Sequence, residues 1–423
     1  MVEKVVVSGM GIVSAIGQSI ADFGLSLEQG KCGIDNVAAM NDELASSMGA
    51  VIRNFSFSDS VNLFSTRAPE LTDIGRRCTN RTPANVQTST IAVMQAWLDA
   101  RLDEKSCPSD RISIIVAGSN LADKQQYDLV ERFNKAPEYI PPSFAFQFMD
   151  TNLVGVLSEV FGIHGEGFTV GGASASGGAA LVKAGQMIKY GLADICVVVG
   201  AHADLSPVTL QAFINIGAMV GTGFIGDPKK ACRPFDLAHA GFIYGQGSGC
   251  IILESLDSAR RRGVNPLAEI TSGAIGLDGN RLSNPSVEGE ARIMSEALRQ
   301  AGLSPSNIDY LNTHGSASPL GDKTEIDAIK RVFKENLSDM WVNSTKALTG
   351  HCLFSAGIVE VIGTIIQMEK GFVHPNINLD NPIDTSCRFS GKTAEKINVE
   401  MAMSNSFGFG GINTSIVIGK IAA

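Results

Sequence analysis

Residues 167–178 read GFTVGGASASGG, and this stretch decides how the chain folds. Its first four residues, 167–170, form a short apolar run that predicts a core strand. Small residues fill 171–178, and a helix is expected over about 179–190. A strand, a tight turn and a helix in this order would hold the Ser174 side chain at a helix N-terminus, where backbone N–H groups stabilise negative charge. This is the geometry of a nucleophile elbow, although a close-packed turn without chemistry fits the same residues.

Apolar runs and amphipathic stretches alternate on both sides of this segment. Strands are expected at 5–7, 112–117, 195–200, 250–254, 267–271, 310–313, 341–344, 401–404 and 414–418. The first of these is expected to end in a glycine turn at Gly9 and Gly11. Helices are expected at 86–103, 288–301, 322–335 and 356–369. Strands that alternate with helices imply parallel sheets covered on both faces, which is the α/β class.

The chain changes character around residues 255–265, where three consecutive arginines precede Pro266 and a new strand. The alternation of strands and helices then begins again. The sequence therefore predicts two similar halves, an N-terminal half of residues 1–255 that carries Ser174 and a C-terminal half of residues 256–423.

Composition excludes several classes of protein. The chain has 423 residues, a net charge of −9, 44% hydrophobic and 18% charged residues, and no long basic run, so a nucleic-acid binder is not expected. The eight cysteines include no CxxC pair and indicate buried thiols in a reducing compartment. With no secretory signal segment and no apolar run long enough to span a bilayer, we expect a soluble cytoplasmic protein that does not contact a membrane.

Two histidines stand in segments of small and polar residues that follow predicted strands. His314 lies in the segment NTHGS at 312–316, and His351 ends the segment STKALTGH at 344–351. A lone histidine is more often structural than catalytic, but two of them beside glycines favour a functional role. Neither HxxxH nor Cys/His spacing is present, so no metal site is expected. Neutral imidazole N–H groups can donate to a developing oxyanion, and one of them can move a proton.

Residues 405–413 read NSFGFGGIN. A glycine-rich loop can cradle phosphate, but this one lacks the lysine of a Walker loop and no helix is expected after it. A flexible loop that places Phe407 and Phe409 at a pocket mouth fits these residues better.

Together these segments resemble the β-ketoacyl-acyl carrier protein synthases, or ketosynthases, over essentially the whole chain. The matching segments are VVSGMGIVS at 6–14, RPFD at 233–236, GF at 241–242, GQG at 245–247, THG at 313–315, GD at 321–322, Lys346, GH at 350–351 and residues 405–413. Their order and spacing make a chance match very unlikely.

The resemblance implies a thiolase-like fold, in which two pseudo-symmetric βαβαβαββ halves stack as five αβαβα layers, and a homodimer. It implies a substrate carried on the phosphopantetheine of an acyl carrier protein, with no further cofactor. By position, His314 and His351 match the family's two catalytic histidines and Lys346 the supporting lysine. Phe409 matches the gating aromatic, with Phe407 beside it, and the Phe409 N–H shares the oxyanion hole with the N–H of residue 174. We also expect Thr313, Thr349 and Gly410 to bind substrate.

The chain departs from the family pattern in two places. Ser174 stands where the family has its cysteine nucleophile. His239 and Ala240 stand where Arg-Asp usually precedes the Gly-Phe pair, which puts the local ion pairing in question.

The serine decides which half-reaction is expected. A cysteine thiol is readily made anionic at a helix N-terminus, whereas a serine hydroxyl stays protonated unless a base acts with it. Condensation should therefore be strongly impaired. Decarboxylation of a malonyl thioester needs only donors to the enolate oxygen, which His314 and His351 can supply. The sequence thus predicts a decarboxylase that turns malonyl-acyl carrier protein into acetyl-acyl carrier protein. It resembles the Cys-to-Ser ketosynthase-like proteins of polyketide β-branching cassettes, which supply acetyl units to a hydroxymethylglutaryl-type synthase.

Three other functions stay open at this point. One is a serine-dependent acyltransferase or thioesterase, another is a condensing enzyme that uses serine, and the third is a silent partner of the chain-length-factor kind. Retention of both histidines argues against the last. Because carrier proteins are acidic, basic residues should mark the docking surface, and the candidates are Arg76, Arg77, Arg81, Lys229 and Lys230.

Overall fold

Two matching sets of five strands form the centre of the molecule. The computed structural model describes residues 3–37, 48–104, 107–224 and 226–421. Among these residues, one sheet has the strand order β12-β10-β9-β14-β15-β8-β1-β7-β6-β4-β5. Its strands are β1 (Val5–Ser14), β4 (Ile112–Ala117), β5 (Gly167–Val170), β6 (Ile195–Gly200), β7 (Gly247–Ser255), β8 (Ala268–Leu277), β9 (Tyr310–Asn312), β10 (Trp341–Asn343), β12 (Arg388–Phe389), β14 (Met401–Gly408) and β15 (Ile412–Gly419).

The pairing pattern of the first set recurs in the second. In the first, β1 pairs antiparallel with β7, β7 antiparallel with β6, and β6, β4 and β5 run parallel. In the second, β8 pairs antiparallel with β15, β15 antiparallel with β14, and β14, β9 and β10 run parallel. The sets join where Val6 and Val7 of β1 pair with Glu269 and Ala268 of β8. This repeat agrees with the predicted pair of βαβαβαββ halves, while their division between residues 255 and 256 stays a prediction.

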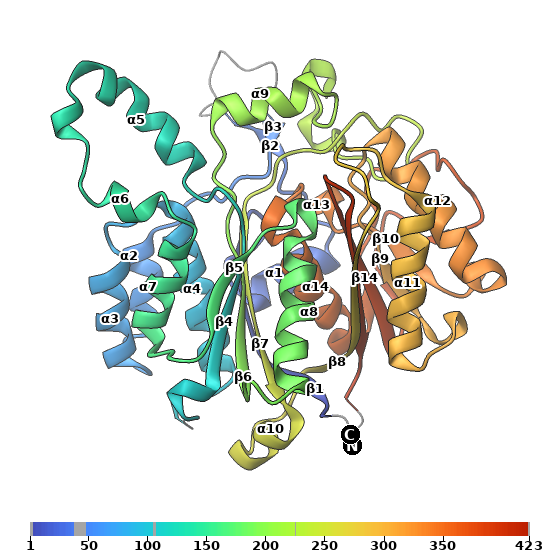
Figure 1. Ribbon diagram of the computed structural model, residues 1–423. Coiled ribbons are helices and arrows are strands. Elements are labelled where there is room, and N and C mark those ends of the chain that lie inside the picture. The colour runs from blue at the N-terminus through green and yellow to red at the C-terminus, as the bar shows by residue number, and fades with distance from the viewer. Residues whose placement is uncertain (1–2, 38–47, 105–106, 225, 422–423) are drawn as a thin grey trace.

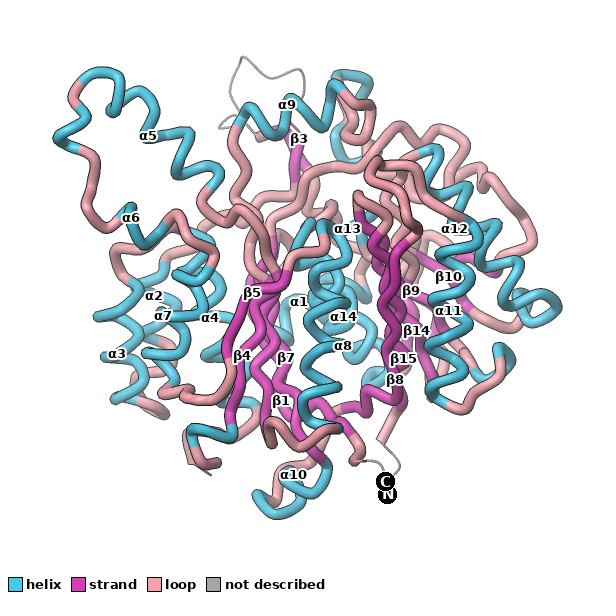
Figure 2. Tube along the Cα trace, viewed as in Figure 1, coloured by secondary structure: helices cyan, strands magenta, loops and turns pink. Residues whose placement is uncertain are grey.

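Helices complete five layers. Helices α8 and α14 lie between the two sets of strands, with α2, α3, α4 and α7 outside the first set and α11 and α12 outside the second (Figure 1; Figure 2). Their bounds are α2 (Phe57–Asn62), α3 (Pro69–Thr79), α4 (Ala84–Asp99), α7 (Thr151–Phe161), α8 (Ser176–Lys189), α11 (Val287–Ala301), α12 (Pro319–Phe333) and α14 (Ala356–Lys370). The other helices are α1 (Ile20–Glu28), α5 (Asp123–Lys135), α6 (Phe144–Gln147), α9 (Pro207–Asn215), α10 (Leu256–Arg262) and α13 (Lys346–Thr349). Two small sheets pair β2 (Asp35–Asn36) with β3 (Met48–Gly49) and β11 (Phe372–Val373) with β13 (Glu395–Lys396).

The glycines of β1 do not form the expected turn. The strand runs on to Ser14, with only a bulge between Val7 and Gly9. A Cβ on Gly9 would lie 2.3 Å from the Ala96 carbonyl oxygen, and one on Gly11 would lie 2.0 Å from the Ala92 carbonyl oxygen. Both carbonyls belong to α4, so these glycines let strand and helix backbones approach each other.

Glycines also bring α8 and α14 together near their N-terminal ends. A Cβ on Gly177 would lie 2.8 Å from the backbone nitrogen of Ile358, and one on Gly357 would lie 2.8 Å from that of Gly178. A 3₁₀ turn precedes each helix, at Ala173–Ala175 before α8 and at Leu353–Ser355 before α14. The structure thus has two equivalent elbows in contact, and only the first carries the serine.

The α8–α14 contact generates a stability prediction with a control on the same helix. Gly177→Ala should lower the free energy of unfolding by about 1–3 kcal/mol, because the new methyl group meets α14 backbone that cannot move aside. Gly185→Ala should raise it by about 0.5–1 kcal/mol, because a Cβ there meets nothing within 4 Å and alanine favours the helix. Urea denaturation of both variants measures the difference, and equal effects of the two substitutions would contradict the close helix contact.

Candidate active site

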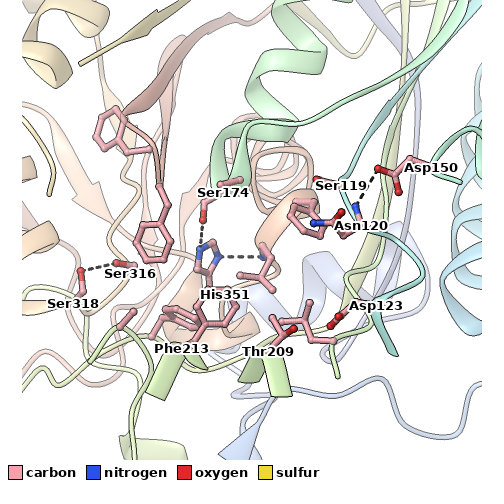
Figure 3. A pocket seen from close by; sticks show the side chains of 18 of the residues that line it. Ser119, Asn120, Asp123, Asp150, Ser174, Thr209, Phe213, Ser316, Ser318 and His351 are labelled. Atoms are coloured by element: carbon pink, nitrogen blue, oxygen red, sulfur yellow. Dashed lines mark hydrogen bonds between the residues drawn. The ribbon is translucent and has the colours of Figure 1, made fainter. Parts of the chain in front are cut away.

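A cavity of about 660 Å³ opens at the N-terminal ends of the two central helices. Residues from both halves line it, including Ser174 from the first elbow, His314 after β9, His351 after α13 and Phe407 from β14. The other lining residues are Ser119, Asn120, Ala122, Asp123, Gln126, Phe148, Asp150, Ala173, Leu205, Thr209, Phe213, Ala218, Phe242, Ser316, Ser318, Leu353, Phe354 and Phe409. The expected meeting of Ser174 with the two histidines therefore occurs, and Figure 3 shows Ser174 beside His351.

Ser174 lies in the turn before α8, and its Oγ is 2.8 Å from His351 Nε2. The residue before it, Ala173, has a φ of +47°, so this non-glycine residue takes up the left-handed conformation at the elbow. Helix α8 begins at Ser176, three residues earlier than the sequence predicts. The predicted elbow is therefore present, with a 3₁₀ turn between the strand and the helix.

The backbone decides which nitrogen of His351 carries the proton. The N–H of Leu353 donates to His351 Nδ1 over 3.2 Å, so Nδ1 is an acceptor and holds no proton. Burial, followed by the charge of Lys346, lowers the pKa of His351 well below its usual value, so the ring is neutral. Its single proton is therefore on Nε2, and His351 donates to the Ser174 hydroxyl.

His351 follows a short helix and not, as the sequence predicted, the end of a strand. It follows the one-turn helix α13 and Gly350, whose φ is +64°, and does not directly follow strand β10. Its backbone N–H donates to the Ile243 carbonyl over 2.7 Å, and its ring packs edge-on against Phe242 with centroids 5.3 Å apart. The histidine is thus fixed by contact with the segment just before β7.

His314 is held by its backbone. Its N–H and that of Gly315 donate to the two carboxylate oxygens of Glu325 over 2.8 and 2.7 Å. Its ring centroid lies 5.5 Å from that of His351, with the two planes at 79°. Burial, then Lys346, then His351 lower the pKa of His314 well below its usual value. Both rings are therefore neutral side by side.

Lys346 stands behind the histidines and does not line the cavity. Its Nζ donates to the His314 carbonyl over 2.6 Å and forms a fully buried ion pair with Glu360 of α14. Burial raises the pKa of Glu360 to about 7, although Lys346 opposes that rise. Lys346 thus fixes the His314 backbone and helps to keep both imidazoles neutral.

The aromatic segment is a hairpin and not the expected flexible loop. Residues 405–408 belong to β14 and pair with residues 412–415 of β15, which leaves only Phe409, Gly410 and Gly411 in the turn. Phe407 is buried, with its ring centroid 5.9 Å from that of His314, whereas Phe409 at the turn is 41% exposed and lies 6.2 Å from Phe213. Both rings line the cavity, as expected, but the prediction of a loop is wrong because the strand pairing continues almost to the tip.

The hairpin also reaches the elbow. A Cβ on Gly408 would lie 2.4 Å from the Gly172 carbonyl oxygen and 3.3 Å from the Ser174 nitrogen. Glycine at 408 therefore lets the backbone just before Phe409 lie against the backbone of Ser174, as a shared oxyanion hole would require.

Comparison with protein families settles what kind of protein this is. Residues 2–259 match the β-ketoacyl synthase N-terminal domain, and residues 267–380 match the β-ketoacyl synthase C-terminal domain. The chain belongs to the β-ketoacyl synthase family.

Relatives and solved structures agree with this assignment. The chain is 37% identical over 419 residues to the polyketide biosynthesis malonyl-ACP decarboxylase PksF of Bacillus subtilis, covering 99% of this chain and 97% of that protein. It is 30% identical to 3-oxoacyl-[acyl-carrier-protein] synthase 2 of Staphylococcus aureus, covering 100% of this chain and 99% of the relative. A β-ketoacyl synthase from Burkholderia phymatum superposes with a TM-score of 0.87 at 26% identity, over 99% of this chain and all of that one. A ketosynthase of a type II polyketide synthase, solved with its acyl-carrier protein, superposes with a TM-score of 0.86 at 25% identity over the whole of both chains. The thiolase-like fold is thereby confirmed.

Three residues expected to bind substrate in this β-ketoacyl synthase do not line the cavity. The Thr313 hydroxyl donates to the Asn343 carbonyl over 2.8 Å, and the Thr349 hydroxyl donates to the Gly350 carbonyl over 2.8 Å. Gly410 lies in the hairpin turn, with a φ of +84°. These placements give no support to a substrate-binding role for the three residues.

Ser316 and Ser318 line the cavity instead, with their hydroxyls 3.1 Å apart (Figure 3). Neither serine was among the residues expected to bind substrate. The sequence does contain a signal for them, because two small hydroxyl residues closely follow His314. A residue two positions after a site residue can lie on the same wall of a cavity.

The cavity of this synthase carries negative charge and no cationic side chain among the described residues that line it. Asp150 accepts from the backbone N–H groups of Asn120 and Leu121 over 3.0 and 2.9 Å, and Asp123 accepts from that of Ser206 over 2.7 Å. Over the described parts of the chain, no cluster of histidine, cysteine and acidic groups is placed to hold a metal ion. In the same residues, no helix has the length and apolarity needed to cross a membrane.

The site geometry predicts how both histidines titrate. Because burial and the charge of Lys346 lower their pKa values, His314 and His351 should stay neutral as the pH falls through 6.5, the usual histidine value, and charge only in more acid solution. Long-range ¹H–¹⁵N NMR spectra should show His351 with its proton on Nε2 at pH 7, with His314→Ala and His351→Ala used to assign the signals. A doubly protonated His351 at pH 6.5, or a proton on Nδ1, would contradict the geometry.

Proposed function

We propose that this β-ketoacyl synthase decarboxylates malonyl-acyl carrier protein to acetyl-acyl carrier protein in polyketide biosynthesis. One observation carries the proposal, namely that His351 Nε2 faces the Ser174 oxygen in the cavity while its Nδ1 accepts from the Leu353 N–H, which leaves Nε2 as a donor. A site with two neutral imidazoles suits an oxyanion formed on a thioester carbonyl. The similarity to PksF, named a malonyl-ACP decarboxylase, agrees with this reading.

The reaction breaks one carbon–carbon bond. The bond between the malonyl carboxylate and the α-carbon is cleaved, and its electron pair moves into the thioester as an enolate. The carboxylate leaves as carbon dioxide, and a proton from water completes the acetyl group. His314 and His351 donate to the enolate oxygen, so they stabilise the transition state more than the substrate.

The cavity also favours loss of the carboxylate. Since no lysine or arginine lies among the described lining residues, the malonyl carboxylate would gain no ion pair there. Asp123 and Asp150 add like charge, and Phe407 and Phe242 contribute apolar walls. Moving the negative charge from this carboxylate to an oxygen held by two N–H donors is therefore favourable.

The proton on His351 Nε2 also argues against a serine acyltransferase or thioesterase. A serine nucleophile needs a base that accepts its proton, and His351 Nε2 already carries one. To become a base, the ring would have to move its proton to Nδ1 and lose the hydrogen bond from Leu353. Ser174 is better explained as a hydroxyl that accepts a hydrogen bond from His351 Nε2. The substrate carbonyl would replace it as the acceptor.

The proposal includes a carrier protein, a homodimer and a place in a β-branching cassette. A related ketosynthase has been solved with its acyl-carrier protein, and the candidate docking residues Arg77 and Arg81 are exposed here.

Strand β5 is at the edge of the sheet, with Phe168 37% exposed, so a second copy can extend the sheet there. A mass of one 44.6 kDa chain by light scattering would contradict the dimer. The acetyl product suits a hydroxymethylglutaryl-type synthase in the cytoplasm.

The test is mass spectrometry of malonyl-carrier protein incubated with the enzyme and its variants. The wild type should remove one carbon dioxide and leave acetyl-carrier protein. His314→Ala should lower kcat about 10²–10³-fold, because it removes one oxyanion donor. Ser174→Ala should keep kcat within about tenfold of wild type, because no covalent step uses the hydroxyl.

Other outcomes identify the alternatives. Acylated enzyme together with free carrier, abolished by Ser174→Ala, would replace the decarboxylase with a serine acyltransferase. Formation of a longer β-ketoacyl carrier would indicate condensation, and an unchanged carrier in every sample would favour a silent partner. Ser174→Cys serves as the matched reference, since a thiol in this elbow should become acylated where the serine does not.

A further inference from the structure

A histidine outside the cavity is paired with a buried carboxylate behind the cavity wall. His239 Nδ1 lies 2.9 Å from Asp322 Oδ2, with side chains 10% and 0% exposed. The proposed mechanism makes no use of His239. Asp322 belongs to the first turn of α12, which begins at Pro319.

The carboxylate of Asp322 holds two residues in strained backbone conformations. It accepts from the N–H of Phe235 over 2.7 Å and from the N–H of Ala317 over 3.0 Å. Phe235 and Ala317 have φ values of +63° and +66°, which side chains other than glycine rarely adopt. Such conformations persist only where the surroundings hold them, and here both depend on the same carboxylate.

Ala317 connects this carboxylate to the cavity. Its neighbours Ser316 and Ser318 line the cavity wall, and their hydroxyls are bonded to each other (Figure 3). The Ala317 carbonyl accepts from the Gly241 N–H over 2.9 Å, which ties the same turn to the segment after His239. The two serines thus flank the residue whose N–H donates to Asp322.

His239 itself is firmly held. Its backbone N–H donates to the Asp236 carbonyl over 3.0 Å, and the Asp236 carboxylate accepts from the N–H groups of Ala238, Asp380 and Asn381. Arg233 pairs with Asp236 and Asp380. The imidazole is thus presented to Asp322 from a fixed loop.

The charged groups around Asp322 leave His239 as its side-chain partner. Burial raises the pKa of Asp322, and its hydrogen bonds with His239 and the two backbone N–H groups oppose that rise. The carboxylate of Glu325, one turn further along α12, repels the Asp322 charge. Lys346 is engaged with Glu360 and the His314 carbonyl, so His239 is the side-chain donor that meets Asp322.

We propose that His239 is a positioning residue for substrate binding: through Asp322 and Ala317 it holds the Ser316 and Ser318 hydroxyls on the cavity wall, where they bind the amide-containing arm of the carrier-bound substrate. The inference rests on the proposed decarboxylase function. His239 touches neither the thioester nor the histidines, so it should affect binding of the arm and not the chemical step.

Steady-state decarboxylation of malonyl-carrier protein tests this with three variants. His239→Leu removes the donor, His239→Asn keeps an N–H near the Nδ1 position, and His164→Leu replaces an exposed histidine bonded to Ser109 as a control. His239→Leu should raise KM about tenfold or more and change kcat less than about threefold, since a hydrogen bond to a charged group is lost. His239→Asn and His164→Leu should have KM values within about threefold of wild type.

A substrate without the arm separates positioning from general damage. Malonyl methyl thioester should be decarboxylated equally well by wild type and His239→Leu, because it cannot contact Ser316 or Ser318. An unchanged KM in His239→Leu, an equal loss with both substrates, or no recovery in His239→Asn would overturn the proposal. If His239→Leu does not fold, His239→Ser, whose hydroxyl is too short to reach Asp322, takes its place. Failure of the wild type to release carbon dioxide would instead overturn the proposed function.

Discussion

The close approach of α8 and α14 is the constraint on which the site depends. Each helix follows an elbow, and the glycines at 177 and 357 let the two elbows touch. Ser174 comes from the first elbow, and the Leu353 N–H that orients His351 comes from the second. A side chain at either glycine would separate the serine from the histidine, because backbone atoms of one helix occupy the space that a Cβ on the other would need.

The chemistry then follows from a single backbone hydrogen bond. Since the Leu353 N–H occupies Nδ1, His351 has only a donor to offer the cavity, and burial beside Lys346 keeps the ring neutral. A cysteine at residue 174 could ionise in such a setting without a base, whereas a serine cannot. Under the proposed function, the exchange of sulfur for oxygen would remove the acyl-transfer step and leave the oxyanion donors untouched, so one substitution would turn a condensing site into a decarboxylating one.

Buried charges behind the cavity wall hold the backbone of the site. Glu325 holds the N–H groups of His314 and Gly315, Lys346 holds the His314 carbonyl, and Asp322 holds Phe235 and Ala317. All of them act through the main chain. Such pairs contribute less to net stability than to a unique arrangement, because desolvation offsets much of their attraction. Here they set the positions of the imidazoles and serine hydroxyls that face the cavity.

Periodicity in the sequence predicted the α/β class and the two similar halves, and small-residue segments after predicted strands indicated Ser174, His314 and His351. The glycine-rich segment at 405–413 indicated Phe407 and Phe409 at a pocket mouth. The resemblance to ketosynthases added Lys346, the gating role of Phe409 and the loss of the cysteine at residue 174. The sequence placed Thr313 and Thr349 in the substrate site, but the structure shows their hydroxyls bonded within the fold, and it missed Ser316, Ser318 and the pairing of His239 with Asp322. It also read the glycines of β1 as a turn and the hairpin at 405–413 as a loop. These points, and the proton position on His351, emerged from the folded structure, because each depends on which atoms from distant segments come within hydrogen-bonding or van der Waals distance.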